Sequence, residues 1–331
     1  MKHTMPIRWR LYSAALAVAL AAGACREPLE FDGEVANPYA VAQCVAQADS
    51  VLSVRLTWSR FFLSSNRTAY PPIANANLSV TCNGAPLTLD SADGATYRFA
   101  HTVRPGDTLR MRATVPGYER GELSAEAVVP ARPAVTLENL SVTTQQSDYG
   151  DNEVTHAIAL RLDDPPGDNY YMLRLEAHIL YKRYQGYADE DGRYHDTVVY
   201  DTIWETPYFE CDDPALVSPE SGLDIAVEGV GGNVYDRLLF TDAAFPGQSH
   251  TLTLRHDAYY YDDNGRPLAF RVIVASCSPE LYRYMQSADA AYNNEDNPFA
   301  EPSQVICNVQ NGIGCFGAQA SAILQFMAQQ K

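Results

Sequence analysis

The segment Val51–Trp58, VLSVRLTW, alternates apolar and polar residues. Alternation with a period of two is typical of a β-strand that buries one face. Further short segments of this kind follow, separated by turn residues: Asn77–Cys82, Thr96–His101, Thr108–Ala113 and Glu122–Val129. Roughly seven strands in about 100 residues predict a β-sandwich of immunoglobulin-like or transthyretin-like type, which we assign to residues 38–130.

A second, larger β-rich domain is predicted for residues 134–331, after the stiff link made by Pro130 and Pro133. Its expected elements are a strand pair, further strands, one short helix and a closing hairpin, at 154–162 with 170–181, 197–205, 252–256, 270–274, 279–293 and around Asn311–Gly312. The helix is predicted because Ser278 suits an N-cap, Pro279 suits the first helical position, and apolar residues follow at helical spacing. The fold class is therefore mostly β, with two β-rich domains in series.

The N-terminal residues have the order of a secretory signal peptide. Basic residues precede a short apolar run, Leu11–Ala22, which ends in small residues directly before Cys25. A cysteine at this point predicts a bacterial lipoprotein, with signal peptide 1–24, lipid on Cys25 and a lipidated tether over 25–37. The alternative is an ordinary signal peptide with an incidental early cysteine.

Charge restricts the partners. The formal net charge is −17, and removal of the three basic residues of the signal peptide would make it about −20. Such an acidic surface repels nucleic acid and anionic headgroups. The apolar run is also shorter than the roughly 20 residues of a spanning helix. We therefore expect no nucleic-acid partner, and contact with a membrane only through the lipid anchor.

No catalytic motif or metal-binding spacing is visible. The chain has no G-x-S-x-G, H-E-x-x-H or P-loop segment and no C-x₂-C pair. Its histidines are scattered, so we predict no enzyme activity, cofactor or metal. The acidic clusters Asp189–Gly192 and Asp262–Gly265 could suggest calcium, but both are too short for the twelve-residue loop and first indicate hairpin turns.

Tyrosine is the one excess that suggests binding. Two groups lie near expected loops: Tyr181, Tyr184, Tyr187 and Tyr194, and Tyr259, Tyr260 and Tyr261. Rigid amphipathic rings on loops are common at protein and sugar contacts. The alternative is that these rings occupy half-buried strand positions, where tyrosine is also favoured.

Four segments resemble the domain-of-unknown-function family 4249. They are Asp163–Leu175 (DDPPGDNYYMLRL), Leu238–Leu254 (LLFTDAAFPGQSHTLTL), Ser278–Ser287 (SPELYRYMQS) and Asn297–Ala318 (NPFAEPSQVICNVQNGIGCFGA). The last is the most specific. It begins with Asn-Pro-Phe-x-Glu-Pro and ends with Gly-x-Gly-x-Phe-Gly, and the two motifs lie at the family's spacing.

The resemblance implies an outer-membrane lipoprotein encoded beside a TonB-dependent receptor. It also implies an added disulfide between Cys307 and Cys315, which stand where the family usually has ordinary residues. The turn at Asn311–Gly312 lies midway between them. Cys44–Cys82 is a second candidate pair in the first domain, and Cys211–Cys277 follows only by elimination.

Two classes of function stay open. The first is an accessory binding subunit of a TonB-dependent nutrient uptake system, lipid-anchored in the outer membrane on its periplasmic or cell-surface face. In that case we expect the second domain to contact the receptor and the first to act as a spacer. The alternative is a structural or adhesive surface lipoprotein without a transported ligand. The sequence names no small-molecule or oligomer ligand.

Overall fold

The computed structural model describes residues 37–61, 70–146, 152–188, 190–216, 234–260, 265–294 and 303–328. The predicted signal peptide and Cys25 lie outside these ranges, as does Tyr261. All the strands and the helix belong to one unit, residues 38–60 and 64–331. The fold is mostly β, as predicted, with several sheets and one helix among the described residues.

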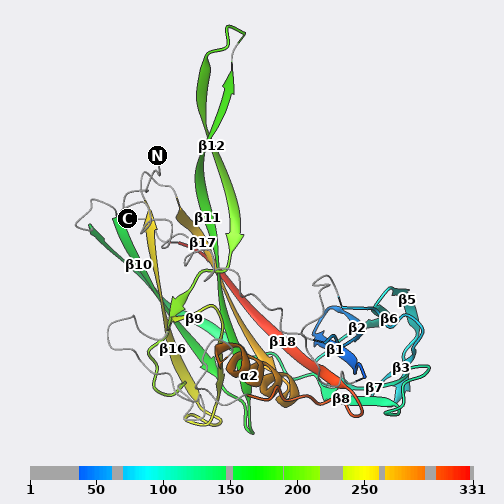
Figure 1. The fold of residues 1–331 in the computed structure, drawn as a ribbon. Helices are drawn as coiled ribbons and strands as arrows, with labels where there is room; N and C mark the ends of the chain where they lie inside the picture. Colours follow the sequence, from blue (N-terminus) through cyan, green and yellow to red (C-terminus); the bar gives the residue numbers. More distant parts are fainter. Residues whose placement is uncertain are drawn as a thin grey trace, which may run out of the picture. The chain divides into compact units, whose positions relative to one another are not determined.

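The first sandwich forms from short strands (Figure 1). Their apolar faces meet in one core. One layer contains β1 (Ala40–Gln47), β2 (Val51–Trp58), β6 (Thr96–Thr102) and β5 (Leu89–Asp93). The other contains β4 (Ala85–Pro86), β3 (Asn77–Cys82), β7 (Thr108–Thr114) and β8 (Leu123–Val128). In β2, Leu52, Val54 and Leu56 are buried while the residues between them up to Arg55 are exposed, so the predicted alternation is confirmed.

The last strand of the chain completes this sandwich. β18 (Ile313–Met327) pairs in parallel with β1 through its first half and antiparallel with β17 (Arg266–Cys277) through its second half (Figure 1, red). Gly314 makes the close approach to β1 possible. Its φ is +117°, and a Cβ there would lie 2.1 Å from the carbonyl oxygen of Ala42. One sheet therefore contains strands from both sides of the predicted boundary near Pro133.

The expected hairpin around Asn311–Gly312 is not formed. Asn311 does turn the chain, with φ of 59°, but residues 303–309 form no strand. The side-chain amide of Asn308 instead bonds to the backbone N–H and C=O of Phe316, at 2.9 and 2.8 Å. The segment after the turn is instead the long strand β18.

The second half of the chain packs two sheets around a separate core. One face belongs to β11 (Tyr170–Ala188), β17 and β15 (Leu238–Thr241). The facing sheet contains β9 (Ala134–Gln146), β10 (Asn152–Asp163), β16 (Ser249–Tyr260), β13 (Phe209–Glu210) and β14 (Val234–Tyr235).

The expected pairing of residues 154–162 with 170–181 is wrong. β10 pairs with β9 and β16, whereas β11 belongs to the other sheet. The connection crosses between the layers, where Asp164 accepts hydrogen bonds from the Tyr171 hydroxyl at 2.6 Å and the Gly247 N–H at 2.7 Å.

The predicted helix is confirmed as α2 (Pro279–Asn294). The Ser278 hydroxyl oxygen accepts the N–H of Leu281 at 3.4 Å and that of Ala318 at 3.2 Å, so it caps the helix and ties it to β18. Leu281 and Tyr282 are buried against Cys277 and Cys315. No helix in the described ranges is long and apolar enough to cross a membrane.

Candidate functional site: an aromatic β-ribbon

β11 and β12 (Tyr194–Glu205) form a two-stranded ribbon at the end of the large sheet (Figure 1). β11 pairs with β17 only as far as Leu180, whereas its pairing with β12 runs from Ala177 to Ala188. Residues 181–188 therefore have β12 as their only strand partner in the described structure, and residues 183–188 are exposed. Side chains on both faces of this ribbon are available for contact.

The register of the ribbon separates its aromatic residues by face. Side chains alternate along a strand, and directly paired residues share a face. The pairs His178–Trp204, Lys182–Tyr200, Tyr184–Val198 and Ala188–Tyr194 therefore lie on one side. We call the four aromatic residues Tyr184, Tyr194, Tyr200 and Trp204 the aromatic face. Their exposed fractions are 67%, 74%, 61% and 36%.

Contacts near the base of the ribbon hold Trp204 in place. Its ring stacks on His178 with a centroid distance of 4.9 Å and an interplanar angle of 11°. The Arg271 guanidinium lies over the same ring, 4.1 Å from the centroid. Arg271 is itself fixed by the Glu176 carboxylate at 2.9 Å. A ring held in this way loses little conformational entropy when a partner binds.

Near the tip, a glycine makes room for Tyr194. A Cβ on Gly186 would lie 1.9 Å from the Tyr194 hydroxyl oxygen, so the ring covers the glycine backbone. Cross-strand aromatic cover of a glycine is a known way to stabilise an exposed strand. Lys182 also places its ammonium 5.9 Å from the Tyr184 ring centroid. Two rings of the aromatic face, Trp204 and Tyr184, thus each have a cation near them.

The opposite face carries the other two predicted tyrosines of the group. Tyr181 donates to Glu205 at 2.8 Å, and this hydrogen bond, with burial, raises the pKa of the tyrosine. Tyr187 stacks on His195 with centroids 5.4 Å apart. Because the register puts Tyr181 and Tyr187 away from Tyr184 and Tyr194, the four predicted residues do not form one surface.

The placement of these tyrosines on a loop is wrong, since they lie on β11 and β12, on either side of the turn described at residues 190–193. Gly192 has φ of 75° there, as expected of a hairpin turn. The sequence interpretation also missed Tyr200 and Trp204. The signal that could have found them is strand periodicity: in residues 194–204 the even positions face one side, so Tyr200 and Trp204 share a face with Tyr194. Tyr259 and Tyr260 are likewise strand residues, at the end of β16.

The six described cysteines are free thiols. The pKa of Cys44, Cys277 and Cys315 is raised to about 12, mainly by burial. Cys307 is exposed. The pairs Cys44–Cys82 and Cys211–Cys277 are not formed, and the latter two thiols belong to different cores. Cys307–Cys315 is not formed either. It stays a prediction, because the turn at Asn311 returns the chain past Asn308.

The scattered histidines gain specific partners in the fold. His250 lies 2.6 Å from Asp213 and His101 lies 2.9 Å from Asp107, both through Nε2. His156 is directly opposite His256 on the paired strands β10 and β16. The contact of His250 with Asp213 and the pairing of His156 with His256 could not be read from sequence spacing, because each joins distant segments of the chain.

Comparison with known proteins gives a family and no described relative. The family described as Domain of unknown function (DUF4249) matches residues 26–323. No match was found among curated proteins. The matched range includes every described strand from β1 to most of β18, together with the aromatic ribbon and α2. The chain therefore belongs to the DUF4249 family.

Proposed function

We propose that this chain is an outer-membrane lipoprotein and an accessory binding subunit of a TonB-dependent nutrient uptake system. The observation that carries the binding role is the aromatic face of the ribbon. Tyr and Trp with a neighbouring Arg are the residues most enriched where binding energy concentrates in protein interfaces. Trp204 with Arg271 near the base and Tyr194 near the tip are spaced along one exposed side.

The ribbon suits a protein partner better than a small ligand. Small-molecule sites are concave and surround most of the ligand, whereas the residues of the aromatic face are exposed along two strands. β12 is also the terminal strand of its sheet, so its outer edge can accept hydrogen bonds from a partner. By the family resemblance, that partner is the TonB-dependent receptor.

A face-selective pair of variants tests the contact. Tyr184→Ala with Tyr200→Ala removes two exposed rings from the aromatic face. Tyr187→Ala with Tyr208→Ala removes two comparably exposed rings outside it, 54% and 69% exposed, since Tyr187 is on the opposite face and Tyr208 lies after β12. Loss of about 2 kcal/mol would weaken receptor binding about thirtyfold.

The measurement is affinity purification of each variant from gently solubilised outer membranes, followed by binding to the purified receptor. Weakening by the first pair alone supports the proposal. If both double variants recover the receptor equally well, the proposal is contradicted and the adhesive or structural alternative is favoured.

Membrane attachment is tested separately at Cys25. Replacement Cys25→Ala should release the protein from the outer-membrane fraction, because the basic, apolar and small-residue order before it predicts lipidation at this residue. A protein that stays membrane-bound at unchanged level would overturn the lipoprotein assignment.

A further inference from the structure

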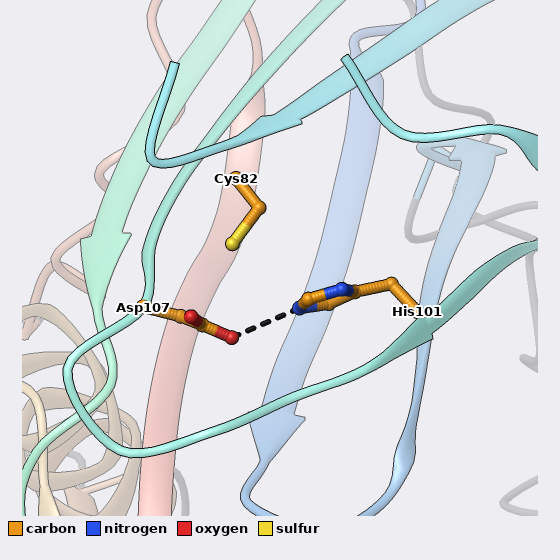
Figure 2. Close-up of side chains that lie close together, drawn as sticks. All are labelled: Cys82, His101 and Asp107. Carbon is orange, nitrogen blue, oxygen red and sulfur yellow. Dashed lines mark hydrogen bonds and ion pairs between the residues drawn. The ribbon is translucent and has the colours of Figure 1, made fainter. Parts of the chain in front are cut away.

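Three side chains with metal-binding atoms converge at one end of the first sandwich, far from the aromatic face along the chain. They are Cys82, His101 and Asp107, whose ligand atoms all lie within 4.8 Å of one another. Figure 2 shows the thiol, the imidazole and the carboxylate directed toward a common region. The three residues come from the end of β3, from β6 and from the turn before β7.

The two layers of the sandwich build this arrangement. Cys82 is held by the pairing of β3 with β7, where its partner is Leu109. His101 belongs to β6 in the other sheet. The turn between β6 and β7 contains Gly106 with φ of 88° and delivers Asp107 between the layers.

We propose that Cys82, His101 and Asp107 form a binding site for a zinc-type divalent cation. Sulfur, imidazole nitrogen and carboxylate oxygen are the three donor types that zinc uses in proteins, at about 2.0–2.3 Å. Tetrahedral bonds of that length place two donor atoms roughly 3.3–3.6 Å apart. The Nε2–Oδ2 distance is 2.9 Å, so a small opening of this pair would admit the ion.

The charges also match. A thiolate, a carboxylate and a neutral imidazole carry two negative charges, which a divalent cation balances in a partly buried place. On binding, the Cys82 thiol releases its proton to solvent, and the His101 ring carries its proton on Nδ1 so that Nε2 can coordinate. A water molecule supplies the fourth ligand.

Neighbouring groups hold the carboxylate in position, as is usual around metal ligands. The Asn83 side-chain amide donates to Asp107 Oδ1 at 3.2 Å, and the Arg104 backbone N–H donates to Oδ2 at 2.9 Å. The side-chain Oδ1 of Asn83 in turn accepts the Thr108 backbone N–H at 2.9 Å. The carboxylate is therefore fixed before any ion arrives.

Without a cation, the hydrogen bonds of the cluster connect the two layers of the sandwich, which is a purely structural role. Burial, a hydrogen bond to Asp107 and the negative charge of the Asp107 carboxylate raise the pKa of Cys82 to about 11. Burial alone would raise the pKa of Asp107, but hydrogen bonds from His101, the Arg104 N–H and Cys82 outweigh it and lower that pKa. A purely structural role and a metal site predict different responses to an added cation.

The test uses the full mature chain in detergent, stripped of metal and carrying Cys307→Ser, so that this exposed residue can neither bind the metal nor form the predicted disulfide. Titration with Co²⁺ should give a near-ultraviolet thiolate-to-cobalt absorption band, which stoichiometric Zn²⁺ abolishes. Excess Zn²⁺ should also raise the melting temperature, because the ion binds only the folded chain.

Variants assign the ligands. Cys82→Ala should abolish the band, and His101→Gln or Asp107→Asn should weaken Zn²⁺ binding at least about a hundredfold. Cys44→Ala, which removes another buried thiol of the same core, should leave binding unchanged. His101 is the most exposed of the three ligands, and its variant serves if the others fold poorly. Absence of the band in the parent, its persistence in Cys82→Ala, or unchanged affinity in a folded His101→Gln would overturn the site.

Discussion

Acidification should destabilise the second core through His156. This side chain is 2% exposed on β10, opposite His256 on β16. The two ring centroids are 6.3 Å apart, and Phe270 meets the His156 ring edge-on at 4.8 Å. Its Nδ1 is buried without a hydrogen-bond partner among the described residues. A proton added to this ring would place a charge in an apolar core.

The magnitude follows from the pKa. Burial first, and the neighbouring His256 second, lower the pKa of His156 from 6.5 to about 4, against the opposing effects of the His256 backbone and Asp257. The pKa of His256 is lowered too, mainly by burial. Below a pH of about 6.5, His156 is protonated in the unfolded chain, whereas in the folded chain it becomes protonated only near pH 4. Stability present at neutral pH is therefore lost on acidification, by about 2 kcal/mol between pH 7 and pH 5 for His156 alone.

Urea unfolding at pH 7 and pH 5 measures this loss directly. His156→Leu cannot take up the proton, so its free energy of unfolding should fall by about 2 kcal/mol less than that of the parent over this interval. Ile158→Val on the same strand is the matched control: it should cost about 1 kcal/mol at both pH values. The reasoning is refuted if His156→Leu loses as much stability on acidification as the parent.

Three further substitutions or measurements test the fold. Gly314→Ala should destabilise the chain by about 3 kcal/mol or more in thermal melts, because its Cβ would overlap the Ala42 carbonyl oxygen; an unchanged melting temperature would contradict the parallel pairing. Ser278→Ala should cost about 1–2 kcal/mol in urea unfolding by removing the helix cap, and a neutral result would contradict the cap. Peptide mapping of exported protein without reduction should find Cys307 joined to Cys315, with stabilisation of about 2–3 kcal/mol; a free Cys307 would exclude that bond.

The strands of the first sandwich were predictable because each buries one face and exposes the other. The bounds of β2 and β3 agree with the predicted segments Val51–Trp58 and Asn77–Cys82. The Asn83–Gly84 turn was also readable, since both residues adopt positive φ, 52° and 84°. In contrast, β9 was missed because its alternation is interrupted. Val135 and Leu137 alternate with polar residues, as do Leu140 and Val142, but the register against β10 shifts at Glu138 between the two halves.

Long-range pairing could not be read from local pattern. The parallel register of β18 with β1 joins Phe316 to Cys44, and nothing near either residue specifies the other. The same holds for the proposed metal ligands, because the distance between Cys82 and Asp107 depends on the pairing of β3 with β7. The aromatic face was half predicted: tyrosine excess was visible, but the choice of face depends on the strand register.

The position of β18 also decides how the receptor contact must be mapped. Truncation after Pro133 is the experiment that the sequence suggests for separating a spacer domain from a binding domain. It would instead remove the strand that pairs with β1 and the buried Phe316, Ala318 and Ala320 that belong to the core of the first sandwich. A truncated chain would thus expose an unpaired β1 edge and part of its core, which favours aggregation. Loss of receptor binding by that chain would report misfolding as readily as a missing contact. Point substitutions on the ribbon avoid this, because residues 183–188 and their β12 partners contribute little to either core.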